Sequence, residues 1–159
     1  MAADEVTIRP AAAGDLPAIG ALWKELTDFH AVRDPHFRPA CDGAEHFLKY
    51  MAESMESDQA WTAVAEVEGH VTGYCLCKDM EMPPVFARRR YELISDLVVG
   101  EGFRRRRIGS RMVEAAMRWF AERGLERIEV RVAVVNEVSS AFWRRMGFAV
   151  YLYSMYLPE

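Results

Sequence analysis

The 159-residue sequence predicts a single α/β domain, in which helices flank a mixed and mostly antiparallel sheet. Segments with apolar periods of two and of about 3.6 residues alternate in the order β-α-α-β-β-β-α-β-α-β. No linker, internal repeat or low-complexity segment interrupts that order, so we expect one domain over residues 1–159. At its centre a strand, a helix and a second strand follow one another, and such a unit is right-handed with parallel strands.

The first half of the chain contains a short strand, two helices and a hairpin. We expect strands over residues 6–9, 60–67 and 71–80, and helices over residues 15–30 and 42–55. Asp15 offers an N-cap to the first helix. Glu68 and Gly69 separate the two longer strands, which therefore form a hairpin.

The second half contains the central unit, then a closing helix and strand. We expect strands over residues 90–99, 128–135 and 148–157, and helices from 108 and from 137. Gly124 and Gly147 end the two helices, because glycine readily adopts the left-handed conformation found there. The strands Arg90–Val99 and Ile128–Val135 should lie side by side and parallel.

Composition argues against several classes of protein. A net charge of −4 does not fit a nucleic-acid-binding surface, so any affinity for polyanions would have to be local. No stretch approaches the roughly 20 apolar residues of a membrane span, so we expect no membrane partner. The three cysteines are at no spacing typical of disulfides, which predicts reduced thiols in a cytoplasmic protein. Cys75 and Cys77 share one face of a strand but lack a second ligand pair, so we expect no metal.

Four consecutive arginines, Arg104–Arg107, separate an apolar strand from an amphipathic helix that begins at Ile108. The first amides of a helix lack intrahelical partners and carry the positive end of its dipole, so they favour an anion. Gly102 and Gly109 free the backbone on either side, and the arginines add charge-assisted hydrogen bonds. A bound phosphate would satisfy both sets of donors, and the alternative is a solvated charged loop.

The segment LVVGEGFRRRRIGSRMVEAAM closely resembles motif A of the GNAT superfamily of acyl-CoA-dependent N-acetyltransferases. In that family Gln/Arg-x-x-Gly-x-Gly/Ala lies between a strand and a helix, and its amides hold the pyrophosphate of coenzyme A. Arg104 and Gly109 match the first and last positions, whereas Arg107 replaces the first glycine and is tolerable there if its φ is negative. NEVSSAFWRRMGF resembles motif B, TIRPAAAGDLPAIGALWKEL the opening of the family, and VTGYCLC its glycine-containing strand.

The resemblance implies the GNAT fold, acetyl-CoA as cosubstrate and a set of residues that bind it. Strands Leu93–Val99 and Ile128–Val135 would splay apart, with pantetheine between them against the backbone of Leu97 and Val99, and the Leu97 amide would polarise the acetyl carbonyl. The implied cofactor-binding residues are Leu97, Val98, Val99, Arg104, Arg105, Arg106, Arg107, Ile108, Gly109, Ser110, Asn136, Phe142 and Trp143.

The implied activity moves an acetyl group from acetyl-CoA to a primary amine by direct attack, which needs a base for the ammonium. We expect Asp96 first, then Glu92, four residues earlier and so on the same strand face, or a water chain ending at Glu92 or Ser95. Trp143 replaces the tyrosine that protonates the thiolate in many family members. Tyr151 is the expected substitute, and a mechanism with no dedicated acid is the alternative.

In this family the first two helices and their loop select the acceptor, so His30 and Asp28 are the expected substrate-binding residues. The acceptor, a small-molecule or peptide amine, stays open. We expect a homodimer, because the last strand of family members often pairs with another subunit and YLYSMYL carries excess apolar surface. Two alternatives stay open: a catalytically silent acyl-CoA-binding domain, and a nucleic-acid-binding module that uses Arg88–Arg90 with Arg104–Arg107.

Overall fold

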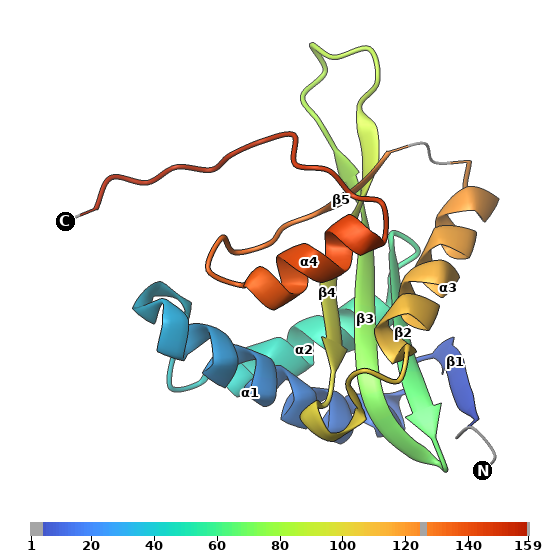
Figure 1. Cartoon of the computed structure of the whole chain (residues 1–159). Coiled ribbons are helices and arrows are strands. Elements are labelled where there is room, and N and C mark those ends of the chain that lie inside the picture. The colour runs from blue at the N-terminus through green and yellow to red at the C-terminus, as the bar shows by residue number, and fades with distance from the viewer. Residues whose placement is uncertain (1–4, 125–126, 159) are drawn as a thin grey trace.

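The computed structural model describes residues 5–124 and 127–158, and Figure 1 shows one sheet with helices packed around it. The strands are β1 (Val6–Pro10), β2 (Ala60–Val67), β3 (His70–Glu81), β4 (Arg90–Val99) and β5 (Ile128–Val130). The helices are α1 (Leu16–Arg33), α2 (Gly43–Glu56), α3 (Ile108–Glu122) and α4 (Glu137–Arg145), with short 3-10 turns η1 (Ala13–Asp15), η2 (Pro35–Phe37) and η3 (Glu101–Phe103). The predicted α/β class and the order of elements up to α4 are confirmed.

The sheet has the strand order β1-β2-β3-β4-β5, and all neighbours are antiparallel except β4 and β5, which are parallel. This confirms the mixed, mostly antiparallel sheet with one parallel pair. Two apolar cores cover its faces. One lies under α3 and α4 and includes Met112, Phe120 and Trp143. The other lies under α1 and α2 and includes Ile19 and Met51. We call these the α3 face and the α1 face.

The predicted hairpin joins β2 and β3. Glu68 and Gly69 have φ values of 49° and 77°, the left-handed conformations that a two-residue type I′ turn requires. Further along β3, a Cβ on Gly73 would lie 2.7 Å from the carbonyl oxygen of Val98 and 3.3 Å from the sulfur of Met112. Only glycine fits this contact without displacing β4, which explains the glycine in this strand.

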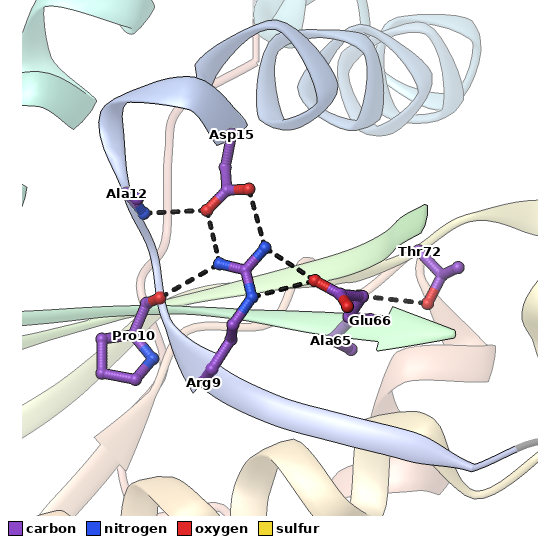
Figure 2. A network of polar contacts seen from close by, with 7 residues as sticks. All are labelled: Arg9, Pro10, Ala12, Asp15, Ala65, Glu66 and Thr72. Atoms are coloured by element: carbon purple, nitrogen blue, oxygen red, sulfur yellow. Dashed lines mark hydrogen bonds and ion pairs between the residues drawn. The ribbon is translucent and has the colours of Figure 1, made fainter. Parts of the chain in front are cut away.

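Arg9 ties β1 and the start of α1 to β2, as Figure 2 shows. Its guanidinium donates to both carboxylate oxygens of Asp15, at 2.7 and 3.0 Å, and to Glu66 at 2.9 Å. Hydrogen bonding by Arg9 lowers the pKa of Asp15. Asp15 also accepts the N–H of Ala12 at 2.8 Å and makes no side-chain capping bond to α1, so the predicted capping bond is not formed.

A β-bulge interrupts β4 at Ser95. Leu76 of β3 is paired with Asp96, while the next residue, Cys77, is paired with Ile94, so the ladder passes over Ser95. Cross-strand partners share a face of the sheet. Leu76 and Asp96 therefore point to the α1 face, and Cys77 and Ile94 point to the α3 face.

The bulge places Glu92 and Asp96 on opposite faces. Glu92 lies two residues before Ile94 and points with it to the α3 face, whereas Asp96 points with Val98 to the α1 face. The prediction that these two carboxylates share a face is wrong. The inserted residue shifts the side-chain alternation by one position, and a count of residues cannot detect that.

Two predicted strands differ from the structure. The strand expected over Ile128–Val135 ends at Val130, because its pairing with β4 stops at Ile94, one residue before the bulge. The strand expected over residues 148–157 is not formed, and Figure 1 shows this segment leading away from the sheet. Within the described residues neither segment has a neighbouring strand with which to pair.

Candidate active site

One edge of β4 is open beyond the bulge, because β4 and the segment after β5 diverge. Within the described residues, pairing between the two strands ends at Val130. On the other side of β4, the N–H of Gly100 donates to the carbonyl of Thr72 in β3 at 2.9 Å. Alternate amides of a strand point to the same side. The N–H groups of Val99 and Leu97 therefore point away from β3, toward the open edge.

The arginine block forms a turn with two residues in the left-handed region. Arg105 has a φ of 66°, and Arg107, the N-cap of α3, has a φ of 62°. The negative φ expected at Arg107 is not found: it adopts a conformation that glycine takes freely and that costs another residue about 1 kcal/mol. Arg106 lies outside that region, so the handedness alternates along the turn. Such alternation gathers successive N–H groups into a concavity that binds anions.

Arg104 holds this turn against α1. Its Nε donates to the carbonyl of Val99 at 3.1 Å, and its guanidinium bonds Glu25 at 2.8 Å. Glu25 also accepts the N–H of Glu101 at 2.8 Å. Sequence reasoning missed Glu25, since a charged residue on a helix is usually solvated. In this arrangement the side chain of Arg104 is already paired with protein groups and positions the turn.

Helix α4 packs onto the first turn of α3. A Cβ on Gly109 would lie 3.4 Å from the ring of Phe142, so the glycine brings the two helices close together. Asn136 caps α4 by accepting a first-turn N–H at 3.0 Å. Trp143 is 7% exposed, with ring centroids 5.1 Å from Phe142 and 5.0 Å from Phe148. Its indole packs in the core and leaves little surface for the ligand contact that was expected of it.

The open edge of β4, the N–H groups of Leu97 and Val99 that point to it, and the arginine turn at the N-terminus of α3 are the features that the resemblance to motif A predicts. The acetyltransferase (GNAT) family matches residues 23–148. The chain belongs to this family.

Relatives and solved structures agree with the assignment. The chain is 28% identical over 144 residues to an uncharacterized N-acetyltransferase of Methanocaldococcus jannaschii, a match over 89% of this chain. It spans 60% of the length of that relative. A tetramutant of protein BH1408 from Bacillus halodurans is 21% identical with a TM-score of 0.85, over 96% of this chain and 99% of that one. The aminoglycoside N-acetyltransferase AAC(6')-Iy in complex with CoA is 16% identical with a TM-score of 0.78, over 98% and 95%. At these identities the two structures show a shared GNAT fold.

Asp96 lies in this GNAT fold on the α1 face, next to the open edge of β4. The hydroxyl of Tyr74 donates to its carboxylate at 3.2 Å. Burial raises the pKa of Asp96, although the Tyr74 hydrogen bond and the charge of Lys78 act in the opposite direction. A carboxylate with a raised pKa, one residue from Leu97, suits a general base. Tyr74 was not predicted, and its only signal was a tyrosine within an apolar strand.

Glu92 is fully buried on the opposite face and is the cross-strand neighbour of Asp79. Oδ2 of Asp79 accepts from Arg90 at 3.0 Å and from Arg123 at 2.6 Å. Its Oδ1 and both oxygens of Glu92 are buried with no partner among the described residues. A proton on Glu92 would give these facing carboxylates the donor that they lack. Burial, followed by this interaction with Asp79, raises the pKa of Glu92 to about 7. Glu92 is five residues from Leu97, roughly 16 Å along a strand, so it lies far from the N–H groups at the open edge of β4.

The expected acceptor residues lie in the second half of α1. Asp28 is exposed and bonds Lys24 at 2.6 Å. The ring of His30 lies 5.5 Å from that of Phe29 and 5.4 Å from that of Phe37, and burial lowers its pKa. A hollow of about 180 Å³ opens between α1 and the start of α4, next to this cluster. Its walls are Phe29, Arg33, Val135, Asn136, Glu137 and Val138.

Tyr151 is remote from the open edge. Its ring centroid lies 4.3 Å from the guanidinium carbon of Arg127, directly before Ile128, which is paired with Glu92. Tyr151 therefore stands at the opposite end of the parallel pair from Leu97. In this chain it does not reach the place where a thiolate would leave, so the structure does not support its predicted role as the acid.

Other features of the described residues bear on the remaining predictions. No helix among them is long and apolar enough to cross a membrane. The same residues contain no group of three or more His, Cys, Asp and Glu side chains that could hold a metal ion. All three cysteines are free, and the sulfurs of Cys75 and Cys77 lie 3.7 Å apart, which confirms that they share a face of β3.

Proposed function

We propose that the chain transfers the acetyl group of acetyl-CoA to a primary amine by direct attack. The observation that carries this proposal is the orientation of the Leu97 and Val99 amides toward the open edge of β4, beside the arginine turn. The turn amides from Arg105 to Ser110 would bind the pyrophosphate. Pantetheine would then follow the free edge of β4 as an additional strand would, with Phe142 and Asn136 alongside.

The chemistry assigns distinct tasks to two neighbouring residues. Asp96 takes the proton of the substrate ammonium, directly or through water, and frees the lone pair that attacks the acetyl carbon. The N–H of Leu97 donates to the carbonyl oxygen, where negative charge develops as the new C–N bond forms. The C–S bond then breaks, and the thiolate takes up a proton from the nitrogen or from water. The hydroxyl of Tyr74 already donates to Asp96, and Tyr151 lies at the far end of the parallel pair, so the proposal includes no dedicated acid.

The acceptor that we propose is a small cationic amine. The hollow beside α1 is lined by the carboxylate of Glu137 and by the ring of Phe29, on which the guanidinium of Arg33 stacks. The carboxylate suits an ammonium, and the apolar walls suit the apolar or hydroxylated body of the same molecule. Several solved neighbours are aminoglycoside N-acetyltransferases, and aminoglycosides are small polyamines. We also propose a cytoplasmic, homodimeric protein, on the basis of its free thiols and its exposed C-terminal segment.

Two functions other than acetyl transfer were left open by the sequence, and the structure bears on each of them. A silent acyl-CoA-binding domain is favoured by the burial of Trp143 and the remote position of Tyr151. A polyanion-binding module is disfavoured, because Arg89, Arg90 and Arg104 form ion pairs with Glu81, Asp79 and Glu25. These partners neutralise much of the charge that such a module would use.

The test combines calorimetry with release of free thiol. Acetyl-CoA should bind at least tenfold more tightly than acetyl-pantetheine, which lacks the phosphates that the turn would bind. With an active amine, Asp96→Asn should lower kcat by about 100-fold or more and remove the acidic limb of the pH profile. Its Kd for acetyl-CoA should not change, and Asp42→Asn, at an exposed residue directly before α2, serves as the matched control. Binding without turnover of any amine identifies the silent domain. Equal affinity for both thioesters refutes the phosphate site.

A further inference from the structure

Three residues of β3 share the α1 face with Asp96, because they lie two apart along the strand: Tyr74, Leu76 and Lys78. Tyr74 and Leu76 belong to the apolar core under α1 and α2, and Leu76 is the cross-strand partner of Asp96. Lys78 packs on α2, with its Nζ 4.0 Å from the ring centroid of Tyr50. Asp96 is therefore flanked along β3 by a phenol on one side and by an ammonium on the other.

The hydroxyl of Tyr74 is a polar group inside an apolar core. Tyr74 is fully buried, and its hydroxyl donates to Oδ2 of Asp96 at 3.2 Å. Burial, and then the charge of Asp96, raises the pKa of Tyr74, so the phenol keeps its proton and remains a donor. The bond occupies one oxygen of the carboxylate and leaves Oδ1 able to accept from a substrate.

The ammonium of Lys78 acts on Asp96 through its charge. It lowers the pKa of Asp96, as the Tyr74 hydrogen bond does, against the larger effect of burial. Helix α2 adds two titratable groups on this side, and α1 contributes apolar residues to the same core. Tyr50 of α2 acts on Tyr74 and raises its pKa. Glu53 of α2 lines a hollow together with Lys78.

This arrangement stabilises the fold less than apolar residues would. A carboxylate whose pKa is raised by burial is less stable in its charged form in the folded protein than in the unfolded chain. Replacing both partners of a buried polar pair by apolar groups of the same shape is often neutral or stabilising. Tyr74 and Asp96 therefore contribute little as a structural pair, and polar groups of this kind beside a reactive position are candidates for a functional role.

We propose that Tyr74 and Lys78 are positioning residues for acetyl transfer. The hydroxyl of Tyr74 holds one oxygen of the Asp96 carboxylate and leaves the other for the substrate ammonium, and the charge of Lys78 favours the ionised form of that carboxylate. The proposal rests on the proposed function, because both residues act through its base. Neither side chain gains or loses a proton in the reaction: the proton of the ammonium moves to Asp96 alone.

Two measurements on the full chain test the role of Tyr74. Carbon-13 NMR follows the titration of the Asp96 carboxyl, assigned by its absence in Asp96→Asn, and needs no acceptor. With an active amine, the acidic limb of kcat/KM reports the same ionisation in the free enzyme. Tyr74→Phe should move both to higher pH by about one unit, which lowers the rate about tenfold along the acidic limb.

Substitutions at Lys78 separate its charge from its packing. Lys78→Met should move the limb in the same direction by a smaller amount, because Lys78 is half-buried and its charge is partly screened. Added salt should reduce this difference further and should leave that of Tyr74→Phe in place. Lys78→Arg keeps the charge and should not move the limb. Lys49→Met, at an exposed residue of α2, is the matched control and should not move it either.

A rate that falls equally at every pH in Tyr74→Phe and Lys78→Met would show structural damage alone and would overturn the proposal. An Asp96 titration that stays in place in either variant removes that residue from it. If Asp96→Asn is inactive in the same experiments, the proposed function stands without these two residues. Full activity of Asp96→Asn removes the base itself. Thermal unfolding and acetyl-CoA binding show separately that Tyr74→Phe is folded, and Lys78→Met leaves the buried core unchanged.

Discussion

Replacement of the buried Glu92 by glutamine should remove a pH dependence from the stability of the fold. Glu92 is fully buried and has a pKa of about 7, against an ordinary value of 4.5. Because its pKa is raised by folding, the folded state binds more protons than the unfolded chain between these two values. The free energy of unfolding therefore falls as the pH rises from 4.5 to 7, and it levels off above 7.

The magnitude follows from the shift in pKa. A change from 4.5 to about 7 corresponds to about 3 kcal/mol, most of which is lost between pH 5 and pH 8. Glutamine stays neutral, and its amide can donate to Asp79 as the protonated acid does. The gain in the free energy of unfolding from Glu92→Gln should therefore be larger at pH 8 than at pH 5 by about 2–3 kcal/mol, or roughly 5–10 °C in Tm.

Urea unfolding at several pH values, followed by tryptophan fluorescence, measures this difference. His30, whose pKa is lowered by burial, contributes a pH dependence of the opposite sign, and it cancels because both proteins contain it. Glu114→Gln, on the exposed side of α3, is the matched control and should give a curve parallel to that of the unchanged protein. A parallel curve for Glu92→Gln as well would refute the account of the buried pair.

Three further changes test the fold around the site. Gly73→Ala should lower the free energy of unfolding by about 1–3 kcal/mol, because its Cβ would lie 2.7 Å from a carbonyl oxygen. A Cβ on Gly102 would meet no atom within 4 Å, so Gly102→Ala should change the free energy of unfolding little in the same urea titration. Equal losses of stability in the two variants would contradict the contact at Gly73. Arg107→Gly should raise Tm through relief of about 1 kcal/mol at a φ of 62°, whereas Arg106→Gly, at a residue outside that region, should lower it. If the Tm rose in both variants, the cause would be the removal of a positive charge rather than the relief of backbone strain. Arg9→Ala should destabilise most at neutral pH. The pKa of its partner Asp15 is lowered, so the stabilisation by this ion pair is present above the ordinary Asp pKa and is lost as the pH falls. If Arg9→Ala lowered the free energy of unfolding equally at every pH of an acid titration, the ion pair would not be the cause.

Local patterns in the sequence were sufficient for the order of elements up to α4 and for the prediction that the arginine turn binds an anion. The change from a period of two to one of about 3.6 residues marks strands and helices whatever their partners are. Arg104–Arg107 stand between a strand and a helix, and a helix N-terminus attracts anions in any fold. The same stretch also carries the resemblance to motif A, and the family match confirms it.

The roles of individual side chains at the site were less accessible to sequence reasoning. The bulge at Ser95 arises from the ladder with β3, and it reverses the face of every later residue in β4, including Asp96. The partner of Arg104 is Glu25, which is 79 residues away in the chain. Trp143 and Tyr151 matched positions where a ligand contact or an acid was expected, yet one is buried in the core and the other lies at the far end of the parallel pair.

The sequence by itself determined the class of fold and the family, and it predicted where a cofactor phosphate would bind, because periodicity and helix dipoles are properties of short segments. Only the tertiary structure decided which carboxylate faces the open edge, which arginine is held by the protein and which strand-like segments lack a partner. Those outcomes depend on contacts between residues distant in the chain. A β-strand in particular exists only when another strand pairs with its hydrogen-bonding groups.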